Sequence, residues 1–346
     1  MICFFLIIFL LCLYQIKFSR KDFQNDFLGI DQATCIKGIF ILFVFFRHIL
    51  SYIRKSGYDF SFFGDIAFKA IDVGIGQLMV VMFLFYSGYG IKESFSRKGY
   101  SYVKAMPKHR ILPTLLNFDI AVICFLLIDL YFDIPFSRKE LLLSIIGWEN
   151  LGNSNWYIFD ILLCYSLAFL SFYFSKHHLA TLSIGIILSI ILLAYLKPSW
   201  WSNTLLSFAG GVFFSEYKAK IVDFLKKHYW ATLSSLLLIF LCIYGTTFIY
   251  KQENIFWICL YNIASILFAM LIVLASMKIK ISNKPLFWLG KNLFPLYIYQ
   301  RIPMILFFEI SPDFVKDNTI TYIIICILLT GIIAHFYKYW QVKINP

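Results

Sequence analysis

The chain has 346 residues, of which 60% are hydrophobic and 14% are charged, and its formal net charge is +12. A mean hydropathy of +0.77 excludes a soluble domain, because a protein of this size has too small an interior to bury so much apolar surface. The basic residues are spread over several short polar segments, which argues against a nucleic-acid partner. We therefore expect a polytopic protein embedded in a lipid bilayer.

The apolar segments are continuous runs typical of membrane-spanning helices, so the predicted fold class is all-α. We place eleven spans along the chain, at roughly 2–16, 35–53, 74–91, 111–132, 157–175, 179–196, 203–216, 230–250, 255–277, 286–308 and 319–337. The span 2–16 is short and is interpreted as retained, with a signal peptide as the alternative. The span 203–216 is also short and holds a Gly-Gly pair, which suggests a broken or partly inserted helix.

The distribution of Lys and Arg predicts the orientation of these spans. With the first terminus outside, the cytoplasmic segments, with Lys291 assigned to them, carry 20 of the 31 basic residues. The segment 92–110 is then cytoplasmic and the segment 133–156 lies outside. This orientation puts Lys37 near the cytoplasmic face and His48 near the outer face.

The predicted spans divide the chain into three parts. Residues 1–34 form an extra N-terminal span with its loop, residues 35–338 form the membrane domain, and residues 339–346 form a cytoplasmic tail. All eight cysteines lie in or at the edges of apolar runs, and none forms a CxxC pair. We therefore interpret them as small core residues and predict neither a disulfide nor a metal site.

Two ionisable side chains mark the ends of the span 35–53. Lys37 and His48 are 11 positions apart, about three helical turns, so they share one face of the helix. Their axial separation is about 16 Å, over half of a hydrocarbon core about 30 Å thick. Ionisable groups inside a bilayer are usually functional, and histidine can act as a base near neutral pH. The structural alternative is that Lys37 extends to the interface and His48 bonds a neighbouring helix.

Small and basic residues follow in the next span and in its connection. Ser87-Gly88, near the cytoplasmic end of 74–91, lets a helix or a ligand approach closely, and helix packing is the simpler interpretation. The connection 92–110 is predicted as a basic loop that ends in Lys108-His109-Arg110. Topology alone explains its charge, although such a cluster also suits the phosphates of a cytoplasmic ligand.

Two further segments place polar residues at the ends of apolar spans. Asn155-Trp156 opens the span that follows the 133–156 segment, where aromatic residues are common at a membrane interface. Asp160 lies one turn farther in and is expected to face protein or water. The segment 287–301 mixes Gly, Lys, Asn and Pro into an apolar stretch, which is unusual for a simple anchor.

Taken in order, these segments resemble the acyltransferase-3 family of bacterial membrane acyltransferases, many of which O-acetylate surface polysaccharides. The resemblance covers about residues 31–310. It depends on five motifs: Lys-x10-His from Lys37 to His48, FxxxSGY at 83–89, a basic segment ending in RILP at 110–113, NWYI at 155–158 and LGKxxxxLYIYQ at 289–300.

The resemblance implies a ten-helix core, an acyl-CoA donor and essential roles for the basic residue and the histidine of the first motif. The site residues that we expect from it are Lys37 and His48 for catalysis, Arg110, Lys108 and Ser87 for donor binding, and Asn155, Trp156 and Asp160 as acceptor-binding or core polar residues. Two positions depart from the family pattern. Pro107 stands where a second arginine is frequent, and Gln300 ends the late motif where histidine is frequent.

We therefore expect a multi-pass O-acyltransferase of the bacterial inner membrane that moves acetyl from acetyl-CoA to a hydroxyl of a surface polysaccharide or its lipid-linked precursor. Acetyl-CoA is the expected co-substrate, with no permanently bound cofactor. The expected partners are the bilayer and a glycan or other hydroxyl acceptor. In this interpretation His48 is the general base, and Lys37 and Arg110 attract the donor phosphates or stabilise the thioester oxyanion.

One geometric difficulty accompanies this expectation. CoA is cytoplasmic, whereas His48 is predicted near the outer face, so either the CoA arm reaches deep into the bundle or the acetyl group is relayed. The alternative function is a transporter or flippase for a lipid-linked glycan. Intramembrane charges and a short Gly-Gly span also suit a translocation path.

Overall fold

The computed structural model describes residues 6–7, 10–11, 14–250 and 252–343. The described part of the chain is almost entirely helical, which confirms the predicted all-α class. Within it, nine helices are long and apolar enough to cross a membrane, so the protein is a multi-pass membrane protein. Most of the predicted span 2–16 lies outside the described residues.

The first half of the structure contains the following elements: β1 (Ile16–Phe18), α2 (Ile30–Lys55), α3 (Phe63–Ile75), α4 (Leu78–Lys98), α5 (Tyr100–Met106), the π-helix η1 (Pro107–Ile111), α6 (Leu112–Tyr131), α7 (Arg138–Ser144) and α8 (Trp156–Phe174). The second half contains α9 (His178–Leu196), the 3-10 helix η2 (Ser199–Trp201), α10 (Leu206–Glu216), α11 (Lys218–Lys227), α12 (Tyr229–Ile249), α13 (Ile255–Lys278), β2 (Ile279–Ile281), α14 (Lys284–Lys291), α15 (Leu293–Tyr299), α16 (Arg301–Ile310), α17 (Pro312–Asp317), α18 (Thr319–Phe336) and the 3-10 helix η3 (Tyr337–Tyr339).

The predicted spans from 35–53 onward each coincide with helical structure. The span 203–216 is the short helix α10, which is unbroken despite its Gly-Gly pair. The span 286–308 is divided into α14, α15 and α16. Asn292, one of the residues that made this segment unusual, ends α14, and Gln300 separates α15 from α16.

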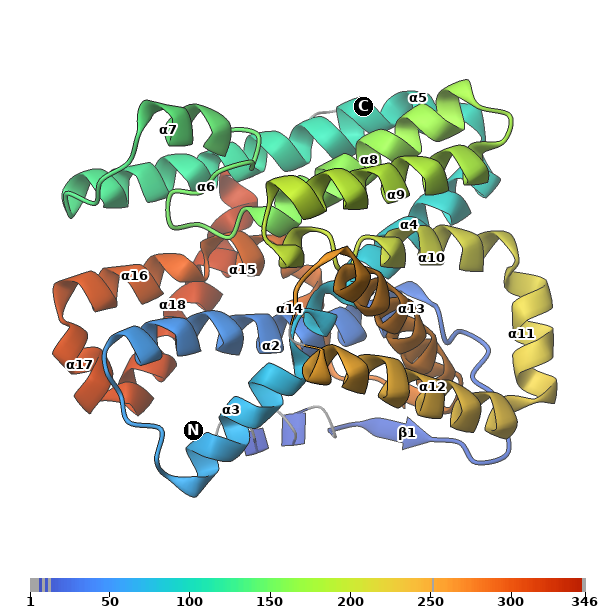
Figure 1. The fold of residues 1–346 in the computed structure, drawn as a ribbon, viewed down its shortest axis with the longest axis horizontal. Coiled ribbons are helices and arrows are strands. Elements are labelled where there is room, and N and C mark those ends of the chain that lie inside the picture. Colours follow the sequence, from blue (N-terminus) through green and yellow to red (C-terminus); the bar gives the residue numbers. More distant parts are fainter. Residues whose placement is uncertain (1–5, 8–9, 12–13, 251, 344–346) are drawn as a thin grey trace.

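Helices α2 and α4 lie at the centre of the bundle (Figure 1). Helix α2 packs against α4, α14, α15 and α16, and α4 packs against α10, α13 and α5. Every residue of α4 from Leu78 to Tyr86 is buried, as expected for a helix that is apolar all round. A fixed, protein-enclosed α2 is therefore the scaffold for Lys37 and His48.

Peripheral helices present their apolar side chains outward, where lipid would surround them. Helices α9 and α12 bury only a small share of their apolar windows. Cys242 of α12 and Cys259 of α13 are exposed on this periphery, so the prediction that all cysteines are core residues is wrong for these two. Hydropathy cannot separate the two environments, because lipid and protein core are equally apolar.

Glycines bring two pairs of helices into backbone contact. A Cβ atom on Gly88 of α4 would lie 2.0 Å from the carbonyl oxygen of Phe208, and one on Gly211 of α10 would lie 2.0 Å from that of Phe85. Gly290 of α14 packs in the same way against Thr34 of α2. Close approach over small residues is a frequent mode of helix association in membranes. The packing interpretation of the Ser87-Gly88 pair is therefore correct for its glycine.

The connection 92–110 is helical, which corrects the prediction of a basic loop. The last turns of α4, the whole of α5 and most of η1 fill it, and Gly99 at φ +62° makes the turn between α4 and α5. Gly99 is the segment's only glycine, and its proline, Pro107, lies at the start of η1, inside a helical stretch that runs from Tyr100 to Tyr131. The helices fix the direction of the basic side chains far better than a loop would.

The beginning of the described chain is tied to a segment far along the sequence. Strand β1 pairs antiparallel with β2, with Ile16 opposite Ile281 and Phe18 opposite Ile279. Beside this pair, the Lys278 ammonium donates hydrogen bonds to the backbone oxygens of residues 20, 21 and 22, each at 3.2 Å. These contacts hold the N-terminal segment against the end of α13.

Candidate functional site

A cavity of about 510 Å³ opens beside α2, at the level of Lys37. Its volume is in the range of small-molecule sites. We call it the central cavity, and its lining residues are Ile30, Lys37, Phe83, Tyr86, Ser87, Gly90, Arg110, Thr114, Tyr157, Ile158, Ile161, Tyr165, Gly290, Lys291, Leu293, Phe294 and Tyr297. All the charged residues among them, Lys37, Arg110 and Lys291, are cationic.

A second volume of about 620 Å³ continues from the central cavity toward the end of the bundle where α4 and α11 meet. We call it the vestibule. It shares Lys37, Arg110 and Gly90 with the central cavity and adds Arg97 and Lys218 to the basic lining, along with acidic residues. The two volumes together form a path from this end of the bundle into its interior.

Lys37 lines both volumes and forms no hydrogen bond or ion pair with any described side chain. It lies three residues after Thr34, where α14 packs closely on α2, so the backbone that carries it is held firmly. An unpaired ammonium at membrane depth is costly unless it meets water or an anionic ligand. The residue is therefore suited to attract negative charge into the central cavity.

Arg110 reaches the same cavity from the π-helix η1. Its guanidinium carbon lies 5.6 Å from the ring centre of Tyr102 and 5.9 Å from that of Tyr165, so two aromatic faces hold it in place. A π turn changes the phase of a helix, and such turns are frequent at functional sites. Lys108, two residues earlier, is exposed and does not line either volume. The structure thus brings Arg110 and Ser87 to Lys37 and leaves Lys108 outside.

His48 lies beyond the inner end of the central cavity. The rings of Tyr157 and Tyr297, which line that end, are 5.2 Å apart, and the Tyr297 ring is 6.3 Å from the ring of His48. On its other side, His48 Nδ1 is 3.5 Å from Ser154 Oγ. Tyr297 therefore stands between the cationic cavity and the imidazole, and its hydroxyl has no hydrogen-bond partner among the described residues.

A family model described as an acyltransferase domain matches residues 28–338, about nine-tenths of the chain. The chain belongs to the acyltransferase-3 family. No curated protein and no solved structure matches it. The protein is accordingly an acyltransferase for groups other than aminoacyl groups.

The remaining predicted site residues of this acyltransferase have different surroundings. Asn155 donates a hydrogen bond to the backbone oxygen of Gly147 at 2.8 Å, which stabilises the loop before α8. Trp156 is half-buried, with its ring 6.1 Å from that of Tyr157. Asp160 is fully buried, and neither of its carboxyl oxygens has a hydrogen-bond partner within the described structure. Only Asp160 among the three is an uncompensated polar group.

Sequence reasoning missed several groups around the His48 end of this acyltransferase. Ser154 and Tyr297 contact the imidazole, and Arg301 anchors the neighbouring loop. Arg301 directly follows the motif at 289–300, and an arginine in an apolar segment was a signal that could have identified it. Ser154 and Tyr297 carry no comparable signal, because serine and tyrosine are common in such segments.

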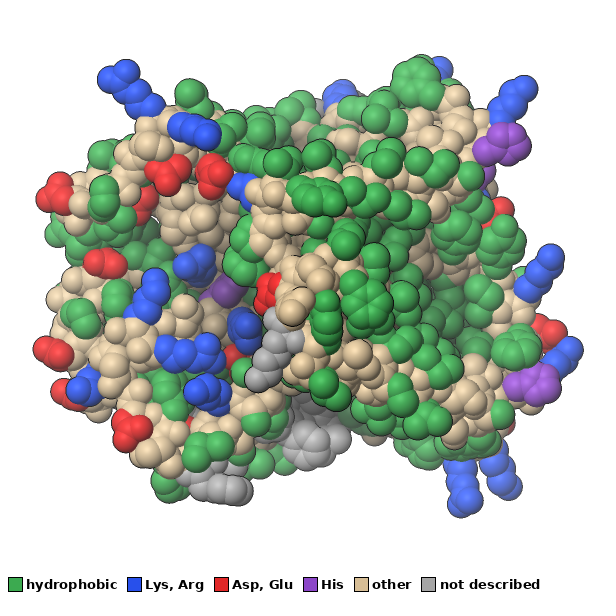
Figure 2. All heavy atoms as spheres, in the orientation of Figure 1, with side chains coloured by type: hydrophobic (Ala, Val, Ile, Leu, Met, Phe, Trp, Pro, Cys, Tyr) green, Lys and Arg blue, Asp and Glu red, His purple; other side chains and the backbone are tan. Residues whose placement is uncertain are grey.

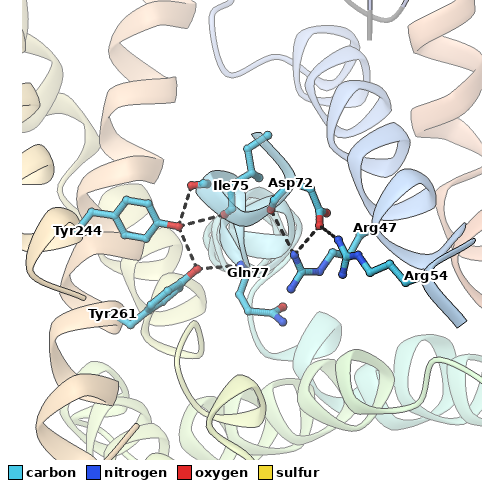
Figure 3. A network of polar contacts seen from close by, with 8 residues as sticks. Arg47, Arg54, Asp72, Ile75, Gln77, Tyr244 and Tyr261 are labelled. Carbon is cyan, nitrogen blue, oxygen red and sulfur yellow. Dashed lines mark hydrogen bonds and ion pairs between the residues drawn. The ribbon is translucent and has the colours of Figure 1, made fainter. Parts of the chain in front are cut away.

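Asp72 of α3 forms another polar network at this end. It accepts hydrogen bonds from Arg47 at 3.0 Å and from Arg54 at 2.9 Å, both on α2 (Figure 3). At the turn after α3, the hydroxyl of Tyr244 donates to backbone oxygens and the backbone N–H of Gln77 donates to the hydroxyl of Tyr261. These contacts hold α3 across the bundle between α2 and the pair α12 and α13.

Proposed function

We propose that this acyltransferase transfers acetyl from acetyl-CoA to a hydroxyl of a cell-surface polysaccharide or of its lipid-linked precursor, and that it works in the bacterial inner membrane. One observation carries the proposal: the cationic path through the vestibule and the central cavity ends at Tyr297, beside His48. A negatively charged donor and a base for a hydroxyl acceptor would thus meet within one bundle.

The donor end of the path is rich in basic side chains. CoA carries phosphates, which bind best to fixed cationic forks and point charges. Arg110 supplies a guanidinium fork held between two rings, and Lys37 and Lys291 supply ammonium groups in a cavity that has no acidic lining residue. Ser87 lies on the same wall and offers a hydroxyl. The thioester end of the donor would then point toward Tyr157 and Tyr297.

The transfer step is a nucleophilic attack by the acceptor hydroxyl on the thioester carbonyl carbon. His48 takes the proton from that hydroxyl while the new C–O bond forms. The C–S bond then breaks, CoA leaves as the thiolate, and the proton passes from His48 to that sulfur. Ser154 would fix the orientation of the imidazole through Nδ1, which leaves Nε2 for the acceptor.

The same path would allow a cytoplasmic donor to meet a base that is predicted near the outer face. The central cavity extends from Lys37 to Tyr297, whose ring is 6.3 Å from the His48 ring. A CoA arm lying in the cavity would bring its thioester close to the imidazole, so no relay residue is required. The Tyr297 side chain would have to move to open the last part of the path.

A transporter of a lipid-linked glycan is the competing function. Family membership favours acyl transfer, and the cationic cavity leads toward a histidine rather than through the bundle. Purified protein in lipid nanodiscs, supplied with acetyl-CoA labelled in the acetyl group and with glycans from cells that lack the protein, would decide between them. We expect an alkali-labile labelled ester on the glycan. Label that stays on CoA with every glycan would contradict the proposal.

A further inference from the structure

Arg301 is the strongest feature that the proposed function leaves unexplained. It begins α16, and its Nε and Nη2 donate to the hydroxyl of Tyr52 at 3.1 and 2.9 Å. Its Nη1 donates to the backbone oxygen of Asn153 at 3.1 Å. Both acceptors are neutral, and no carboxylate in the described chain lies within ion-pair distance of this guanidinium. Its positive charge is therefore not neutralised by an ion pair.

The charge lies next to the proposed base. Asn153 directly precedes Ser154, which contacts His48 Nδ1, and the charges of Arg301 and Arg47 both act on the imidazole. Three bonds use three of the five N–H groups of a guanidinium, so one N–H on each terminal nitrogen of Arg301 stays available. Free N–H groups of a guanidinium form charge-assisted hydrogen bonds with carboxylates and phosphates.

Two further arginines on α2 add positive charge at this end of the bundle. Arg47 and Arg54 share a single carboxylate, that of Asp72, so the network in Figure 3 keeps an excess positive charge. Their side chains are 37% and 39% exposed, so an anion from solution can reach them. Asp129 and Glu309 also lie near Tyr52, but neither forms an ion pair with any described arginine or lysine. Figure 2 shows Lys and Arg side chains in the left half of the view, over α2, α3 and α16, with Asp and Glu side chains around them.

We infer that the acceptor is anionic and that Arg301 binds a carboxylate or phosphate of the glycan so that the reacting hydroxyl lies at His48. The inference rests on the proposed function and specifies its substrate class. An anchor of this kind would orient the acceptor without taking part in bond making, so Arg301 is a specificity-determining residue. Neutral glycans would leave its guanidinium with only neutral partners and would bind weakly.

The test uses the full-length protein in nanodiscs and acetyl-labelled acetyl-CoA. The acceptors are surface glycans from cells that lack the protein, separated by anion exchange into neutral and anionic fractions. We expect label in the anionic fraction only. Prior reduction of carboxyl groups should abolish the signal if a sugar acid is the acceptor, and prior removal of phosphate groups should abolish it if a phosphate is the anchor.

Variants test the residue itself. Arg301→Gln should raise the apparent KM for the anionic fraction about tenfold or more, because it removes charge-assisted hydrogen bonds, and it should leave the KM for acetyl-CoA within twofold. Arg301→Lys should recover part of the loss, since the charge remains and the fork does not. Lys316→Gln on α17, an exposed residue, removes the same charge from the neighbouring helix and should change neither KM.

The outcomes distinguish failure of the anionic acceptor from failure of the proposed function. Label in the neutral fraction, or equal use of both fractions, would overturn the anionic acceptor and leave acyl transfer intact. An Arg301→Gln variant whose donor KM rises as much as its acceptor KM would overturn the role of Arg301. Label recovered only as free acetate, or not released from CoA at all, would overturn the proposed function and this inference with it. The comparison of fractions uses the natural protein, so it stays decisive if a variant fails to fold.

Discussion

Lys37 and His48 lie on the same helix but meet different surroundings. Lys37 is in an open cationic cavity and has no partner among the described side chains, whereas His48 is behind Tyr297 and contacts Ser154. The lysine is placed for long-range attraction of an anion and the histidine for proton transfer at short range. We therefore expect substitutions of Lys37 to weaken binding of the anion and substitutions of His48 to slow turnover.

Replacement of His48 tests the base. His48→Ala should lower turnover by about a hundredfold or more, because a positioned base contributes about that much to a proton transfer. His48→Gln keeps a similar size and a hydrogen bond to Ser154 but accepts no proton, and we expect it to be as inactive as the alanine variant. Acetyl transfer is measured beside membrane expression and thermal stability in detergent. Near-normal transfer by His48→Gln would make His48 a structural residue.

Arg110 and Lys108 form a matched pair on one π-helix. Arg110→Ala should raise the KM for acyl-CoA more than the KM for the acceptor, since Arg110 lines the donor side of the path, and Arg110→Lys should restore only part of it. Lys108→Ala removes a cation two positions away that does not line the path, and donor KM should stay unchanged. Steady-state kinetics with varied donor measure both. Equal changes in donor KM at the two positions would mean that the basic residues of 92–110 serve only to orient the protein in the membrane.

At the scale of elements, backbone contact between helices sets the positions of the site residues. Gly88 and Gly211 bring α4 against α10, and Gly290 brings α14 against α2. Ser87, Lys37 and Lys291 line the central cavity, and each is within three residues of one of these contacts. Loosening a contact would therefore alter the cavity as well as the stability of the bundle.

The neighbouring glycines of α10 provide an internal control. A Cβ atom at Gly211 would lie 2.0 Å from the Phe85 oxygen, whereas one at Gly210 would meet Ile266 at an ordinary 3.7 Å. Gly211→Ala should destabilise the bundle by about 1–3 kcal/mol, as overpacking does, and lower its unfolding temperature in detergent. Gly210→Ala should be neutral or raise it, because alanine favours helix by about 1 kcal/mol. The same shift for both variants would contradict the packing described here.

The positions of the long helices were predictable from the sequence, and their partners were not. Hydropathy decides where about 20 apolar residues can span a bilayer, so α2, α6, α12 and α18 begin and end near their predicted bounds. Helix α3 was missed because its 13 residues are too few for that criterion. The helical form of 92–110 was missed because charge patterns report topology and carry no information on backbone conformation.

The candidate site, too, was predictable from the sequence only in part. Lys37, Arg110 and Ser87 were selected from motifs, and the structure brings them to one cavity. Lys108 was selected with them but is turned away, because neighbours on a helix point in different directions. Tyr297, Ser154 and Arg301 reach His48 or its surroundings from segments at least 100 residues along the chain. Contacts of such long sequence separation depend on tertiary packing, and a single sequence does not reveal them.

For the whole molecule, the bias of basic residues predicts which end of the bundle faces the cytoplasm. Single cysteines at positions 97 and 145, introduced on a background without the native cysteines, would report it. An impermeant thiol reagent added outside intact cells should label 145 and leave 97 unlabelled until the membrane is opened. The reverse labelling would invert the orientation and place the vestibule outside, away from cytoplasmic acetyl-CoA.

The pairing of β1 with β2 has a consequence for the time course of synthesis. Residues 16–18 find their partners only when residues 279–281 have been made, and at about 5–20 residues per second this takes roughly 13 to 52 s. Throughout that interval the strand Ile16–Phe18 has unpaired backbone groups, while most of the bundle is already being inserted. Helices α14 to α18 are synthesised after β2. Ribosomes stalled before residue 279 should therefore hold a nascent chain whose residues 16–18 are still accessible to protease.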